Sequence, residues 1–144
     1  MTRNETGEKK PSIFVWTIVF GIAFNLLGWA GNNFLLGDLW DAAGNEVKAG
    51  FAAPWPPIVK EIITLISDFV YAFVMVWMFS NARRQSVAFA IQLAVVAWLS
   101  GVAPVYLVLV NGGFLPFEVS IKTSLLALVI FIAGAPFMAR ALKH

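Results

Sequence analysis

Residues 57–79 decide the class of this protein. They read PIVKEIITLISDFVYAFVMVWMF, an apolar run that few charged residues interrupt. About 20 apolar residues in a helix, at a rise of ~1.5 Å each, span the ~30 Å hydrocarbon layer of a bilayer. We therefore expect this segment to cross a membrane as a helix.

The composition of the whole chain supports the same class. Of its 144 residues, 60% are hydrophobic and 12% are charged, whereas about 25% of the residues of an ordinary soluble domain are charged. The net charge of +2 is too small to indicate nucleic-acid binding. The chain has no cysteine and one histidine, His144. We therefore expect no cofactor, and no metal site built from thiolates or paired imidazoles.

The predicted fold is all-α, a single domain in which four transmembrane helices form an antiparallel bundle. The predicted spans are residues 12–31, 57–79, 86–110 and 117–142, and residues 1–11 form a polar tail. Pro56 and Pro57 suit the first turn of the second span, and Ser86 is expected to cap the third. Pro104 cannot donate a backbone hydrogen bond, so a kink is expected in the third span.

Residues 32–56 are predicted to form an external loop. Its first part, Asn33–Trp40, either extends the first helix or lies in the membrane interface with Trp40 among the headgroups. Ala43-Gly44-Asn45 is interpreted as a turn, because small and polar residues with glycine are typical of turns.

Basic residues predict the orientation of the chain. With both termini in the cytoplasm, seven of the ten lysines and arginines lie inside: Arg3, Lys9, Lys10, Arg83, Arg84, Arg140 and Lys143. The remaining three, Lys48, Lys60 and Lys122, lie outside. Because cytoplasmic loops are enriched in Lys and Arg, we expect a multi-pass protein of a bacterial inner membrane with both termini cytoplasmic.

The first span carries small and polar residues along one face. Gly21, Asn25, Gly28 and Asn32 follow one another at offsets of 4, 7 and 11 residues, which places them on the same side of a helix. Small residues allow membrane helices to approach closely. We interpret this row as a helix-packing face, and the alternative is that Asn25 belongs to a polar site together with Asp68.

Asp68 lies near the middle of the second span, where a carboxylate is costly and is a candidate functional group. The candidate polar site consists of Asp68, Asn25, Thr64, Tyr71, Gln92 and Ser100. No lysine or arginine lies at this depth, since Lys60 is about 12 Å along the same helix. Three interpretations stay open: a neutral Asp68 that joins two helices by a hydrogen bond, a proton or cation relay, and a contact with a partner subunit.

Two short motifs resemble a group of uncharacterised small four-helix membrane proteins of bacteria. The first combines Asp68-x-x-Tyr71-Ala72, Val76-Trp77-Met78-Phe79 and Arg83 in and after the second span. The second is NFLLGDLW over Asn33–Trp40. The resemblance covers two of the four predicted spans, and it implies a four-helix fold and an inner-membrane location but no activity.

Three functional interpretations follow from the sequence. The favoured one is a non-enzymatic membrane protein that assembles with itself or with a larger membrane complex. The alternative is a proton-coupled carrier or channel centred on Asp68. An enzyme that acts on lipid would have only Asp68, Glu61, Tyr71 and Ser100 as candidate groups, and these match no known catalytic constellation, so we predict no catalytic residues.

Overall fold

A computed structural model describes residues 12–46, 56–83 and 85–142 of the chain. Its elements are α1 (Ile13–Phe34), α2 (Gly37–Glu46), α3 (Pro57–Ser80), α4 (Val87–Ala97), the π-helical turn η1 (Trp98–Val102), α5 (Ala103–Asn111) and α6 (Phe117–Leu142). The described residues contain no strand, which confirms for them the prediction of a helical chain. The predicted tail and residues 47–55, 84 and 143–144 lie outside the described part.

Four helical segments are long and apolar enough to cross a membrane, as predicted. They are Ile13–Phe34, Ile58–Ser80, Val87–Asn111 and Phe117–Leu142. The third segment combines α4, η1 and α5, which follow one another without a break.

Polar side chains and prolines set where these helices begin. Ser12 and Ser86 precede α1 and α4, and their hydroxyl oxygens accept hydrogen bonds from the backbone N–H groups of Val15 (3.4 Å) and Phe89 (3.1 Å). The predicted role of Ser86 as a cap is therefore confirmed. Pro57 occupies the first turn of α3, where its missing N–H leaves no helical bond unmade.

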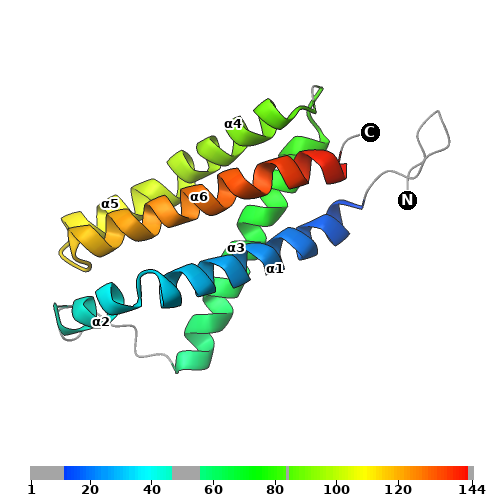
Figure 1. The fold of residues 1–144 in the computed structure, drawn as a ribbon. Helices are drawn as coiled ribbons and strands as arrows, with labels where there is room; N and C mark the ends of the chain where they lie inside the picture. The colour runs from blue at the N-terminus through cyan, green and yellow to red at the C-terminus, as the bar shows by residue number, and fades with distance from the viewer. Residues whose placement is uncertain (1–11, 47–55, 84, 143–144) are drawn as a thin grey trace.

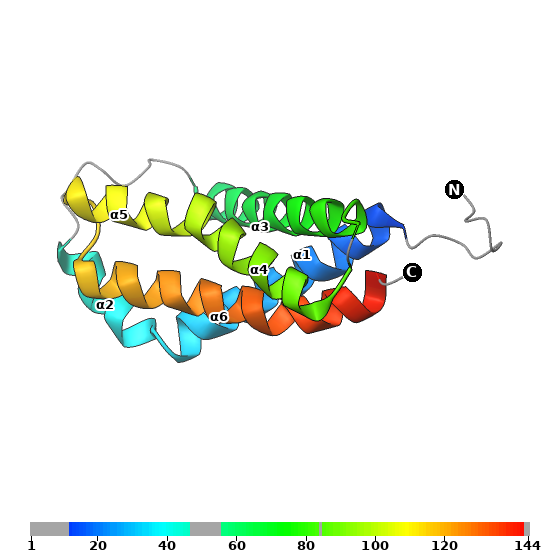
Figure 2. The same ribbon diagram turned by 90° about the horizontal axis from the view of Figure 1, so that it is seen from above.

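The helices alternate in direction, so both described ends of the chain lie at one end of the molecule (Figures 1 and 2). We call this the termini end, and it also holds the α3–α4 connection. The opposite end, which we call the α2 end, holds α2, the start of α3 and the α5–α6 turn. In that turn Gly113 adopts a positive φ of 70°, which favours glycine over other residues.

The helix α3 takes a different course from the other long helices. Figure 1 shows α1, α6 and α4–α5 running alongside one another, with α3 crossing behind α1 at a steep angle. Among the described elements, α3 packs against α1, α4 and α6, whereas α5 packs against η1 and α6 but not α3. As a result, α3 is enclosed at the termini end and separates from α5 towards the α2 end.

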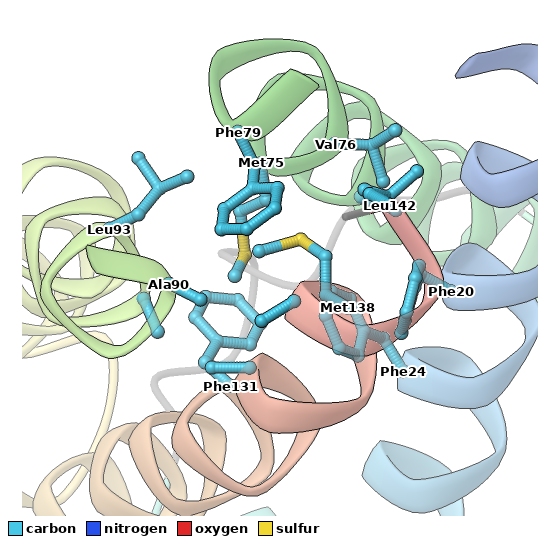
Figure 3. Packing of buried hydrophobic residues seen from close by; sticks show 14 of the residues in the cluster. Phe20, Phe24, Met75, Val76, Phe79, Ala90, Leu93, Phe131, Met138 and Leu142 are labelled. Carbon is cyan, nitrogen blue, oxygen red and sulfur yellow. The ribbon is translucent and has the colours of Figure 1, made fainter. Parts of the chain in front are cut away.

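The apolar core draws its buried residues from α1, α3, α4, η1 and α6, and Figure 3 shows how their side chains pack against one another. Its largest fully buried side chains are Phe79, Met75 and Val76 of α3 and Met138 and Leu142 of α6. Ala90 and Ala94 of α4 are also fully buried. Their small side chains let α4 approach this cluster closely.

The region predicted as an external loop is mostly helical in its described part, residues 32–46. Helix α1 continues to Phe34, and α2 follows after two residues. The predicted turn at Ala43-Gly44-Asn45 is wrong, because these residues belong to α2. Two tertiary features favour α2. The Trp40 indole N–H donates a hydrogen bond to Asn32 Oδ1 at 3.0 Å, and the Ala43 side chain is buried, with an exposed fraction of 2%. Packing of α2 against α1 and α6 therefore outweighs the local turn preference of its residues.

A kink was predicted near Pro104, and the structure has a π-helical turn, η1, directly before it. Proline has no N–H with which to bond the carbonyl of Ser100, four residues earlier. The Ala103 N–H instead donates to the Trp98 carbonyl, five residues earlier. One such wider turn continues the helix past the missing donor, so the third span stays helical from Val87 to Asn111.

Candidate functional site

Asp68 and Asn25 meet where α3 crosses α1. The side-chain Nδ2 of Asn25 donates a hydrogen bond to Asp68 Oδ2 at 3.0 Å, and both residues are partly buried. Beside the pair, Phe69 packs directly on Gly21: a Cβ at Gly21 would lie 2.7 Å from Phe69 Cδ1. The absence of a side chain at Gly21 thus permits the close crossing that brings Asn25 to Asp68.

Asp68 marks the point at which α3 passes from an exposed to a buried environment. All residues from 60 to 67 are exposed, more than two full turns, so every side of this part of α3 carries exposed residues. One and two turns beyond Asp68, Ala72 and Met75 are each 1% exposed. Glu61, Thr64 and Leu65 lie on the same helical face as Asp68, and we call these four residues the open α3 face.

The described residues offer Asp68 no positive charge. Lys122 pairs with Glu118 on the surface of α6. The nearest basic residue along α3 is Lys60, about 12 Å away by helical rise. A charged side chain at the centre of a membrane helix costs about 2.5–3.5 kcal/mol, and a hydrogen bond between membrane helices contributes roughly 0.6 kcal/mol. Asn25 alone therefore offsets only part of the cost of an ionised Asp68.

Three other residues of the predicted polar site lie apart from this pair. The hydroxyl of Thr64 donates to the Lys60 carbonyl at 3.1 Å, within its own helix. The hydroxyl of Ser100 likewise donates to the Val96 carbonyl at 2.8 Å. Gln92 is exposed on α4. The structure thus reduces the predicted six-residue site to Asn25 and Asp68, with Tyr71 one turn away.

Tyr71 connects α3 to the π-helical turn instead of to Asp68. Its ring packs against Phe131, with the ring centroids 5.6 Å apart. Its hydroxyl oxygen lies 2.6 Å from the position that a Cβ would take at Gly101. The lack of a side chain at Gly101 therefore provides the space that Tyr71 occupies between α3 and the third span.

The predicted packing face of α1 is occupied only in part. Gly21 and Asn25 contact α3, but nothing lies within 4 Å of a Cβ built at Gly28. Asn32 serves another contact, since its Nδ2 donates to the Gly28 carbonyl at 2.8 Å and its Oδ1 accepts from Trp40. Because α3 crosses α1 at a steep angle (Figure 1), it leaves α1 before it reaches Gly28.

The second close contact of α1 uses a glycine that the predicted face does not include. A Cβ at Gly31 would lie 2.6 Å from Cδ2 of Leu126. This contact faces α6, whereas the contact at Gly21 faces α3. One continuous packing face was predicted for α1, and its two neighbours instead contact two different faces of this helix.

A row of hydroxyl side chains on α6 was not among the predicted site residues. Ser120, Thr123 and Ser124 are buried, with exposures of 2%, 6% and 5%. The Trp98 indole N–H donates to both the carbonyl (2.7 Å) and the hydroxyl (3.1 Å) of Ser124. Their spacing of three and four residues within an apolar span is a signal that could have found this row.

Three buried hydroxyls have no hydrogen-bond partner among the described residues. They are Oγ1 of Thr17, Oγ of Ser120 and Oγ1 of Thr123. Two of them belong to the hydroxyl row of α6. The α2 end of the α6 packing surface is therefore more polar than the apolar core at the termini end.

The chemistry available at the Asn25–Asp68 pair is limited to one carboxylate and one amide. No group of three His, Cys, Asp or Glu side chains suited to a metal ion occurs in the described part of the chain. The carboxylate can accept hydrogen bonds, hold a proton or face a positive charge.

Comparison of the chain with protein-family models, curated proteins and solved structures found no match. The resemblance to small four-helix bacterial membrane proteins therefore stays a prediction.

Proposed function

We propose that this chain is an integral membrane protein without catalytic chemistry of its own, which acts by assembling with other membrane helices. The observation that carries this proposal is the change along α3. The same helical face that forms the core around Met75 and Phe79 is uncovered from Glu61 to Leu65, and Asp68 lies at the boundary. A partner helix on the open α3 face would extend the packed core and shield the carboxylate.

The orientation that we propose places the termini end in the cytoplasm of a bacterial cell and the four spans in its inner membrane. Arg83 and Arg140 lie towards the termini end, whereas Lys60 and Lys122 lie near the starts of α3 and α6 at the α2 end. This distribution supports the positive-inside orientation. Because the chain lacks cysteine, single cysteines at Gln85 and Asn111 can report it. An impermeant thiol reagent applied to spheroplasts should label only the Asn111 site, and labelling only at Gln85 would reverse the orientation.

Assembly is tested by the native mass of the protein extracted from its membrane in a mild detergent. We expect a mass that exceeds one chain and its detergent, as a defined species with a fixed stoichiometry. A single chain that retains its fold and carries nothing else would contradict the proposal.

A proton-coupled carrier or channel is the second candidate function, because Asp68 is partly exposed at mid-span and can exchange a proton. Purified protein in liposomes distinguishes the two functions. A carrier would move protons or cations when a pH gradient is imposed, and Asp68→Asn would abolish the flux while leaving the fold intact. An assembly protein would show no flux in either form.

A further inference from the structure

We propose that the open α3 face binds a transmembrane helix of another protein that carries a lysine or arginine at the depth of Asp68. The inference rests on the proposed function, assembly with other membrane helices, and it specifies the chemistry of the partner. The surface concerned consists of Glu61, Thr64, Leu65 and Asp68 on α3, together with the partly exposed Gly28 on α1.

The surface is suited to a helix. A polypeptide within the hydrocarbon layer must satisfy its own backbone hydrogen bonds, so a partner at this depth is helical. Nothing lies within 4 Å of a Cβ at Gly28, one turn from Asn25, and a small residue here allows a neighbouring backbone to come close. The exposed part of α3 provides more than two turns of helix for the contact.

The carboxylate of Asp68 is the group on this surface that lacks sufficient donors. The hydroxyls of Thr64 and Ser67 donate to carbonyls of their own helix at 3.1 and 3.0 Å, so neither needs a partner. Asp68 accepts one bond, from Asn25 to Oδ2, and no donor to its Oδ1 occurs among the described residues. An ammonium or guanidinium group would supply both the missing donor and the opposite charge.

A second copy of this chain fits the surface less well. Two copies inserted in the same direction and related by a two-fold axis would bring one Asp68 opposite the other at the same depth. Like charges at such a position disfavour the ionised forms. A basic residue of a different protein removes this repulsion, and we therefore assign the surface to a heterologous partner.

The test uses synthetic transmembrane peptides of defined sequence. Leucine-alanine helices of about 20 residues carry a central lysine, glutamine or glutamate and a donor dye at either end. The full-length protein carries an acceptor dye at a single cysteine introduced at Ile58, which is 65% exposed. Energy transfer in phosphatidylcholine liposomes is measured as a function of the peptide-to-lipid ratio.

We expect the lysine peptide to bind the wild-type protein at an about tenfold lower ratio than the glutamine peptide. A charge-assisted bond is stronger than a neutral one by about 1.4 kcal/mol, which corresponds to a tenfold change in affinity. The glutamate peptide should not bind. Asp68→Asn should reduce the binding of the lysine peptide to the level of the glutamine peptide. Asp38→Asn, which removes an exposed carboxylate of α2, is the matched control and should leave all three peptides unchanged.

Several results would overturn the proposal. One is equal binding of the lysine and glutamine peptides, and another is a preference for the lysine peptide that persists in the Asp68→Asn variant. A third is the absence of peptide binding together with disulfide cross-linking between two copies of a Leu65→Cys variant. Asp68-dependent binding of tetraphenylphosphonium without binding of any peptide would assign the carboxylate to a small lipophilic cation. Circular dichroism of each variant verifies that the helices persist.

Failure of this inference differs from failure of the proposed function. If Asp68→Asn leaves the native mass of the extracted assembly unchanged, the protein assembles without the charge pair and only the inference is wrong. If the wild-type protein is a single chain that conducts protons or cations, the assembly function itself is wrong.

Discussion

The two halves of the molecule use the same helices in different ways. At the termini end, α3 and α6 meet through side chains such as Phe79, Met138 and Leu142, which are at most 2% exposed. At the α2 end, α3 is exposed on every side from residue 60 to residue 67. Both halves of α3 consist mainly of apolar residues, so their amino-acid composition does not explain why one half is buried and the other exposed. The direction of α3 causes it, because this helix crosses α1 and then diverges from α5 (Figures 1 and 2).

The helix α6 shows the same contrast. Its buried side chains at the termini end include Ile130, Phe131 and Met138, whereas those at the α2 end include Ser120 and Ser124. Membrane helices gain little from apolar burial against each other, because lipid is equally apolar, and they depend on close packing and hydrogen bonds. The termini end relies on packing and the α2 end on fewer, more polar contacts, which leaves the α2 end more open to a partner.

The largest expected effect comes from the packed half. Phe79→Ala should lower the free energy of unfolding by about 3–5 kcal/mol, because it leaves a cavity in a core that cannot fully collapse. Ile66→Ala, in the uncovered part of α3 where Ile66 is 57% exposed, should change it by less than about 0.5 kcal/mol. Equilibrium unfolding in mixed detergent micelles measures the free energy of unfolding of both variants. Similar losses for the two variants would mean that the α2 half of α3 is packed as well.

The crossing of α1 and α3 provides the next effect. Gly21→Leu should destabilise the protein by about 1–3 kcal/mol, because the new side chain occupies the space of the Phe69 ring. Gly28→Leu is the matched control on the same helix, and it should be close to neutral because nothing lies within 4 Å of its Cβ position. Thermal unfolding in detergent ranks the two variants. A greater loss for Gly28→Leu would contradict the steep crossing.

The smallest effect concerns the polar contact at the α2 end. Trp98→Phe removes the N–H that reaches both oxygens of Ser124 and should cost about 1 kcal/mol. Ser124→Ala should cost less, because the Ser124 carbonyl still accepts the bond. Chemical or thermal unfolding of both single variants and of the double variant gives the coupling energy. A coupling of zero would show that this hydrogen bond does not stabilise the pairing of η1 with α6.

The amino-acid sequence by itself determined the helical fold and the approximate position of four segments that are long and apolar enough to cross a membrane. Length and hydropathy suffice for this, because a helix must be apolar over the thickness of a bilayer whatever it packs against. Neighbouring residues also determine where the helices begin. Ser86 caps α4 through its own hydroxyl, and Pro57 fits the first turn of α3.

The site depended on tertiary structure. Helical spacing alone grouped Gly21, Asn25, Gly28 and Asn32 on one face and placed Asp68 near the depth of Asn25. Only the crossing angle of α3 decided that Gly21 and Asn25 meet this helix while Gly28 stays uncovered. The same holds for Thr64, Gln92 and Ser100, which were predicted to join the polar site but face their own backbone or the exterior. Sequence periodicity fixes which residues share a helix face, whereas the packing of all helices together determines what that face contacts.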